Sequence, residues 1–142
     1  MQTSFTEKQL ENKENKTSET ILRKCVHCGM CNATCPTYGI NGDELEGPRG
    51  RIYLIKDMLE NNKPANKKIT QHIDSCLSCY SCMTTCPSGV NYMHLIDHGR
   101  NYVEETYKRP FIERTFRNIL SFVLPRPKVF LTLAILTKFI KP

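Results

Sequence analysis

Apolar residues recur at helical spacing along most of the chain, and polar or proline-containing segments separate the predicted helices. One helix is predicted from Pro48 to about residue 62, with a broad apolar stripe made of Ile52, Tyr53, Ile55, Met58 and Leu59. Further helices are predicted over residues 67–75, 91–107, 110–124 and 128–140. No segment has the alternation of a half-buried strand, so the sequence predicts an all-α fold.

Three regions are expected along the chain. Residues 1–20 are polar and predict a flexible N-terminal tail, with a short helix beginning near Thr17 or Ser18. Residues 21–109 hold every cysteine, and residues 110–142 form a basic amphipathic helical extension. The polar start lacks the apolar core of a secretory signal, so we expect a cytoplasmic protein, either free or at the inner face of the cytoplasmic membrane.

Composition and charge remove several classes of function. The chain has 142 residues, of which 39% are hydrophobic and 24% are charged. It contains no run of 18 apolar residues, so no membrane-spanning helix is predicted. The net charge is +6, and residues 100–142 supply this surplus with nine basic and three acidic side chains. These basic residues alternate with apolar ones, as on an amphipathic helix, so no nucleic-acid partner is expected.

The last predicted helix contains the segment VFLTLAILTKFI, which is apolar almost all round. Such a helix is normally buried, so we expect another subunit, or further chain of a longer subunit, to cover it. The second interpretation is peripheral association with a membrane surface, because Arg126 and Lys128 are basic.

The cysteines form two groups of four with one spacing, C-x2-C-x2-C-x3-C-P. The second group repeats the first at an offset of 51 residues, including the proline that follows the fourth cysteine. The two groups are Cys25, Cys28, Cys31 and Cys35, followed by Cys76, Cys79, Cys82 and Cys86. This pattern predicts two [4Fe–4S] clusters with thiolate ligands.

In two-cluster ferredoxins the fourth cysteine of each motif binds the other cluster. The expected ligands of cluster 1 are therefore Cys25, Cys28, Cys31 and Cys86. The expected ligands of cluster 2 are Cys76, Cys79, Cys82 and Cys35. No separate catalytic residue is predicted.

Three other uses of the cysteines fit the sequence less well. Zinc sites are usually built from two CxxC pairs on separate arms, which fits this spacing poorly. Disulfides are disfavoured by the absence of an export signal, and thiol catalysis would not need eight cysteines. Cys35 and Cys76 are separated by 40 residues that include a helix, which indicates an α-helical ferredoxin domain of the kind found in respiratory iron–sulfur subunits.

Two arginines in the segment GPRGR, Arg49 and Arg51, are candidates for hydrogen bonds to a cluster or for subunit docking. Cations and hydrogen bonds near a cluster stabilise its reduced form. A surface pair at the start of a helix is the equally open alternative. Histidines 72, 94 and 98 were interpreted as structural or exposed residues.

Three stretches, CVHCGMCNATCPTYGINGDELEGPRGRIYLIKDMLE, HIDSCLSCYSCMTTCPSGVNYMHLIDHGR and FVLPRPKVF, resemble the iron–sulfur subunits of glycolate oxidase (glycolate dehydrogenase). The resemblance runs from about Ile21 to the C-terminus. It implies an oxidoreductase complex that converts glycolate to glyoxylate, in which this chain carries electrons. It also implies FAD on separate flavin-containing subunits and an acceptor in the respiratory chain.

Subunits of that family continue into cysteine-rich repeats that this sequence lacks, so we expect a piece of a longer subunit. Iron–sulfur subunits of glycerol-3-phosphate, lactate or heterodisulfide oxidoreductases share the motifs and are the alternatives. A zinc-binding interaction module is the alternative from another class.

Overall fold

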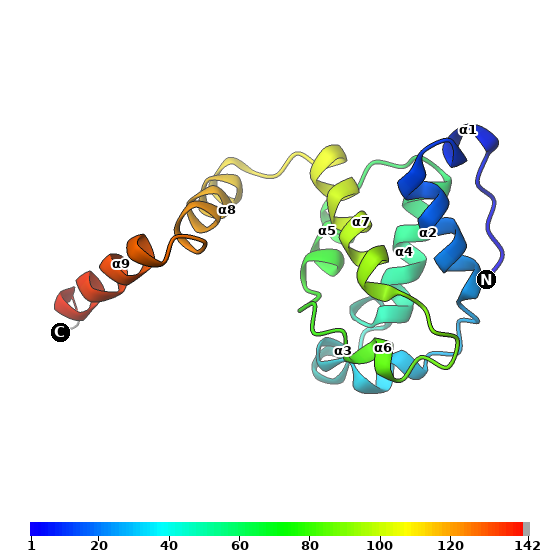
Figure 1. Cartoon of the computed structure of the whole chain (residues 1–142), viewed down its shortest axis with the longest axis horizontal. Helices are drawn as coiled ribbons and strands as arrows, with labels where there is room; N and C mark the ends of the chain where they lie inside the picture. The colour runs from blue at the N-terminus through cyan, green and yellow to red at the C-terminus, as the bar shows by residue number, and fades with distance from the viewer. Residues whose placement is uncertain (141–142) are drawn as a thin grey trace. The chain divides into compact units, whose positions relative to one another are not determined.

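The computed structural model describes the backbone of residues 1–140 and the side chains of residues 1–135. Every regular element in this part of the chain is a helix (Figure 1), which confirms the predicted all-α class. The elements are α1 (Glu7–Leu10), α2 (Lys13–Lys24), η1 (Met30–Thr34), α3 (Pro36–Asn41), η2 (Glu44–Glu46), α4 (Pro48–Glu60), α5 (Lys67–Asp74), α6 (Ser81–Thr84), α7 (Tyr92–Thr106), α8 (Phe111–Val123) and α9 (Pro127–Ile140).

The chain divides into two compact units, residues 1–107 and residues 108–142. The sequence placed the corresponding boundary between residues 109 and 110. The first unit contains all eight cysteines together with helices α1 to α7.

The core of the first unit is formed by α2, α4, α5 and α7 (Figure 1). Its fully buried apolar side chains are Leu22, Ile55, Met58, Ile73, Leu95, Ile96 and Val103. The apolar stripe predicted on α4 is buried except at Tyr53, which is 57% exposed. Tyr53 is two residues before Ile55, about 200° around the helix from it, so it faces away from the core.

Helices α4 and α7 approach each other closely at Gly99. A Cβ atom at this position would lie 2.8 Å from Ile55 Cγ1 and 2.9 Å from Ile55 Cδ1. Glycine therefore permits the close contact between the two longest helices of the first unit. Both helices begin next to the cysteine loops, α4 at Pro48 and α7 at Tyr92.

The N-terminal segment is folded, in contrast to the flexible tail predicted for residues 1–20. Helix α2 begins after Asn12, whose side chain caps it by accepting from the backbone N–H of Glu14 and Asn15. The buried Gln9 side chain donates to the backbone oxygens of Leu59 and Glu60, each at 2.9 Å, which anchors the segment on α4. Sequence reasoning missed this contact because polar side chains hydrogen-bonded to backbone leave no apolar periodicity.

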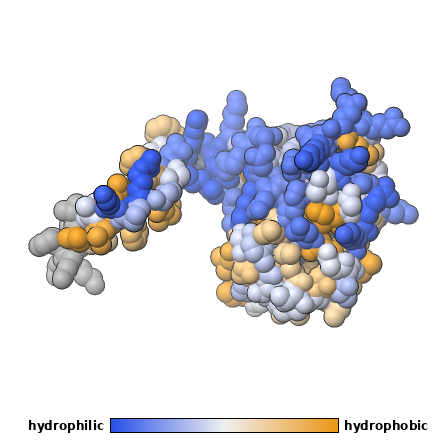
Figure 2. Space-filling view, in the orientation of Figure 1, coloured by the Kyte–Doolittle hydropathy of each residue, from blue (hydrophilic) through white to orange (hydrophobic). Residues whose placement is uncertain are grey.

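The second unit contains α8 and α9. Large apolar side chains on both helices are exposed, and Figure 2 shows them in orange along this unit. Among them are Phe111, Ile112, Phe122 and Leu131. No single helix of residues 1–135 has the length and hydropathy needed to cross a membrane. Helix α8 and the first part of α9 meet that test together, but their axes are bent by 108°. Residues 141–142 of the predicted extension lie outside the described residues.

Candidate functional site

The cysteine motifs occupy one end of the first unit, beside α3 and α6 (Figure 1). In each motif the backbone takes the left-handed conformation at two equivalent positions. His27 (φ 59°) corresponds to Ser78 (φ 52°), and Gly29 (φ 84°) corresponds to Tyr80 (φ 56°), each pair 51 residues apart. Non-glycine residues seldom adopt this conformation, so the duplicated sequence also gives a duplicated loop shape.

The two loops contact each other at equivalent positions of the repeat. The hydroxyl groups of Thr34 and Thr85, which are again 51 residues apart, lie 3.2 Å from each other. Each threonine directly precedes the fourth cysteine of its motif, so this contact lies next to both Cys35 and Cys86 in the sequence.

Two hollows lie at this end of the unit. The first has a volume of about 440 Å³, and the cysteines in its lining are Cys25, Cys28, Cys31, Cys82 and Cys86. The second has a volume of about 290 Å³, and the cysteines in its lining are Cys35, Cys76, Cys79 and Cys82. The structure thus brings each fourth cysteine to the first three of the other motif. Cys82 borders both hollows.

The thiols affect one another electrostatically both within and between the two motifs. Burial is the largest cause that raises the pKa of the Cys31 thiol, to about 11. The nearby charges of Cys25, Cys86 and Cys28 raise it further. Burial is also the largest cause that raises the pKa of the Cys82 thiol, to about 12, and the charge of Cys31 is the next largest. Thiols with such pKa values hold their protons at neutral pH, so metal binding must displace protons from them.

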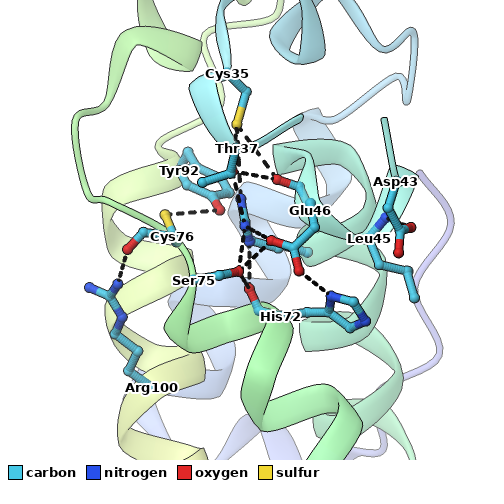
Figure 3. A network of polar contacts seen from close by, with 11 residues as sticks. Cys35, Thr37, Asp43, Leu45, Glu46, His72, Ser75, Cys76, Tyr92 and Arg100 are labelled. Carbon is cyan, nitrogen blue, oxygen red and sulfur yellow. Dashed lines mark hydrogen bonds and ion pairs between the residues drawn. The ribbon is translucent and has the colours of Figure 1, made fainter. Parts of the chain in front are cut away.

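Several groups point at cysteine sulfurs. The backbone N–H of Val90 donates to Cys86 Sγ at 3.4 Å, and the Tyr92 hydroxyl donates to Cys76 Sγ at 3.7 Å. Burial, followed by the Cys76 charge, raises the pKa of Tyr92 well above its ordinary value, so this hydroxyl stays a donor. Arg100 holds the loop of the second motif by donating to the Cys76 carbonyl at 2.6 Å (Figure 3).

A buried polar network lies beside Cys35. Arg51 is 1% exposed and pairs with Glu46 at 2.8 Å. Glu46 also accepts from His72 and from the Ser75 hydroxyl (Figure 3). Burial acts to raise the pKa of Glu46, but the hydrogen bonds from Ser75 and His72 and the charge of Arg51 outweigh it, so the pKa is lowered. Glu46 is therefore ionised at neutral pH.

Arg49 lies on the side of the other hollow, whose lining includes it. Its Nε donates to Glu44 at 2.5 Å, and both side chains are partly exposed, at 32% and 42%. This pair corresponds to the surface alternative for the GPRGR segment. Arg51, in contrast, is a core residue.

All eight predicted cysteines are at this end of the unit, and all eight are free thiols. Sequence reasoning missed the network residues Glu46, His72, Ser75 and Thr37. His72 was predicted to be structural or exposed, and its burial agrees with the structural alternative. One sequence signal could have indicated the network. The acidic Glu46 ends the short helix η2, and the basic Arg51 follows five residues later in the first turn of α4.

The donor set fits iron–sulfur clusters. Each hollow is lined by at least four thiols, which are the ligands that iron–sulfur clusters take. Within the described residues, no group of three or more His, Cys, Asp or Glu side chains is arranged to hold a single metal ion. Clusters bound here would take thiolate ligands from both motifs.

Comparison with known proteins agrees with this donor set. Residues 21–90 match the family model described as a 4Fe-4S dicluster domain. This match and the eight cysteines assign two [4Fe–4S] clusters to the domain. No solved structure matches the chain.

Three curated relatives share the region. The glycolate oxidase iron-sulfur subunit of Escherichia coli (strain K12) is 52% identical over 142 residues, which are all of this chain and 35% of that protein. The probable glycolate oxidase iron-sulfur subunit of Bacillus subtilis (strain 168) is 33% identical over 117 residues, which are 79% of this chain and 26% of that protein. The succinate dehydrogenase iron-sulfur subunit of Paracoccus denitrificans is 29% identical over 76 residues, which are 49% of this chain and 29% of that protein. The chain spans about a third of the length of the first relative and about a quarter of the second.

Proposed function

We propose that this chain, whose residues 21–90 match the model of a 4Fe-4S dicluster domain, transfers electrons as the iron–sulfur subunit of a glycolate oxidase complex. The observation that carries the electron-transfer part is the pair of adjacent thiol-lined hollows that share Cys82. Clusters held side by side form a short path for single electrons. The 52% identity to the E. coli subunit supports glycolate as the substrate of the complex.

We propose the ligand sets that the sequence predicted. Cluster 1 would be held by Cys25, Cys28, Cys31 and Cys86, and cluster 2 by Cys76, Cys79, Cys82 and Cys35. The contact between Thr34 and Thr85 and the lining of the two hollows support this exchange of fourth ligands. Cys28 and Cys79 are exposed, so each cluster would have one edge near the surface.

The chain's own residues would hold the clusters, limit access of water and tune their electronic properties. When bound, each cluster supplies a site that accepts and releases one electron. The N–H of Val90 and the hydroxyl of Tyr92 are placed to donate to ligating sulfurs, which stabilises the additional negative charge of a reduced cluster. Pro48 and Ile52 contribute apolar lining to the first hollow.

Oxidation of glycolate to glyoxylate releases two electrons and two protons. We propose that FAD on a partner subunit accepts the electron pair, and that this chain passes the electrons singly towards a respiratory acceptor. An apolar rim of Val26, Met30 and Leu77, exposed by 66%, 55% and 67%, offers a partner contact close to the exposed cysteines. Two of these residues, Val26 and Leu77, are equivalent positions of the repeat.

We propose a cytoplasmic location, with peripheral contact to the inner face of the membrane as the second form. Support comes from α8, whose apolar residues occupy one face while Arg114 and Arg117 lie on the other. Such a helix suits either a membrane surface or a protein partner.

The proposed function is tested by anaerobic EPR spectroscopy of the subunit purified with its flavin partners. Glycolate is added first, and dithionite is added afterwards as the control. Reduced-cluster signals after glycolate are the expected result. Signals that need dithionite would keep the electron-transfer role and reject glycolate, in favour of a lactate or glycerol-3-phosphate complex. Colourless protein with bound zinc and no signal would reject the iron–sulfur proposal.

A further inference from the structure

The guanidinium of Arg51 is aimed at a proposed cluster ligand from inside the core. Its Nη1 donates to Cys35 Sγ at 3.9 Å, and its side chain is 1% exposed. Its Nε donates to the His72 carbonyl at 2.6 Å. Its Nη2 faces Glu46, Thr37 and Ser75. The guanidinium is therefore fixed in orientation by acceptors on several segments of chain.

The network connects the first cysteine motif to the segment that leads into the second. Cys35 ends the first motif and Thr37 follows it in α3, whereas His72 and Ser75 lie at the end of α5, directly before Cys76. Figure 3 shows Cys35 at one end of this network and His72 at the other, with Glu46 between them. Because Cys35 is the ligand that would cross to cluster 2, Arg51 holds it where the second motif can use it.

The charge arrangement around Cys35 is asymmetric. The Glu46 carboxylate pairs with Nη2 and also accepts from Ser75 and His72, while Nη1 faces the sulfur. The positive group therefore lies between the carboxylate and the ligand atom. A buried charge acts through a lower effective dielectric than an exposed one, and a hydrogen bond to a thiolate is strengthened by its charge.

We propose that Arg51 is a positioning residue for Cys35 that also raises the reduction potential of cluster 2, the cluster assigned to Cys35, Cys76, Cys79 and Cys82. This inference rests on the proposed function. In the part of the chain that the structure describes, Arg49 is the arginine that lines the hollow of the opposite cluster, and it is 32% exposed and paired with Glu44, which is 42% exposed. Solvent screens such a pair, so its influence is smaller.

Potentiometric EPR titration of the full chain with its clusters tests the proposal, with Arg51→Met as the main variant. At the wild-type midpoint of cluster 2, we expect the ratio of reduced to oxidised cluster 2 to fall at least tenfold, which equals 59 mV for a one-electron couple. The Cys79→Ser variant identifies the cluster 2 signal, because that signal should be missing from it. Arg49→Met is the matched control on the same helix and should change the ratio less than threefold.

A second variant gives a prediction of opposite sign. Glu46→Gln removes the negative charge and retains Arg51, so the ratio of reduced to oxidised cluster 2 should rise. This variant decides the question if Arg51→Met fails to assemble its clusters: a rise supports the proposal, and an unchanged or lower ratio overturns it.

A purely structural role for Arg51 would lower cluster occupancy without moving the potential of the clusters that remain. An Arg51→Met ratio within threefold of wild type therefore overturns the proposal. Failure of the wild-type chain to bind any cluster would instead overturn the proposed function, so the two failures are distinguishable.

Discussion

The contact between α4 and α7 at Gly99 provides a quantitative test of the fold that positions the cysteines. Gly99→Ala places a methyl group 2.8 Å from Ile55 Cγ1 and 2.9 Å from Ile55 Cδ1. Both distances are shorter than 3.0 Å, which is the lower limit of Cβ contacts in proteins. Ile55 is fully buried, so its side chain cannot turn into solvent. Overpacking of this kind costs about 1–3 kcal/mol.

Alanine also removes the entropic penalty of glycine in a helix, which acts in the opposite direction. Gly39→Ala is the matched control, because Gly39 is also helical and its added methyl would meet nothing within 4 Å. Gly39→Ala should stabilise the chain by about 0.5–1 kcal/mol. The difference between the two variants isolates the clash, and we expect Gly99→Ala to be the less stable by about 1–3 kcal/mol.

Anaerobic thermal unfolding, followed by circular dichroism at one scan rate, measures this difference. Each 1 kcal/mol corresponds to roughly 4–8 °C in Tm for a domain of this size. The double variant Gly99→Ala, Ile55→Ala should lose less stability than the sum of its single variants, because the second change removes the clashing atoms. If Gly99→Ala matched or exceeded the Tm of Gly39→Ala, the close approach of α4 and α7 would be refuted.

Two further predictions follow from burial and from the thiol chemistry. His98 donates to or accepts from Ser18 at 2.7 Å, and burial lowers its pKa, with Glu14, His94 and Glu105 as the facing groups. In the unfolded chain His98 takes up a proton near its ordinary pKa of 6.5, whereas in the folded chain it stays neutral to lower pH. The stability that comes from burying neutral His98 is therefore fully present above pH 6.5 and is lost as the pH falls towards the folded-state pKa. Wild-type Tm should therefore fall more than that of His98→Gln between pH 7.5 and 5.5, and equal slopes would contradict this. Removal of iron by an anaerobic chelator should abolish the cooperative thermal transition of the first unit, because the two hollows would lose the groups that bridge their walls. A cooperative transition in the iron-free chain would show that the helices alone form the core.

Helices with an apolar stripe, such as α4 and α7, were predictable from the sequence, and the polar contacts were not. Helix α4 could be predicted because the apolar residues Ile52, Ile55 and Leu59 recur at the helical period. Residues 1–20 were mispredicted because Gln9 anchors them through backbone oxygens, which have no sequence pattern.

The cysteines were identified by spacing alone, because a cluster requires several sulfurs on a short turn of backbone. The burial of Arg51 was not predictable in the same way. Arg49 and Arg51 have the same local sequence context, and their different environments depend on how α5 and η2 pack around the start of α4. Tertiary structure therefore distinguishes the core guanidinium from the surface one.

The central claim is that each motif completes the cluster of the other, and a set of four single Cys→Ser variants tests it most directly. Iron content and the EPR spectrum of each dithionite-reduced variant are measured anaerobically. We expect Cys86→Ser to show the same spectral loss as Cys28→Ser, and Cys35→Ser to show the same loss as Cys79→Ser. If Cys86→Ser instead matched Cys79→Ser, each motif would bind its own cluster, and the exchange of ligands would be contradicted.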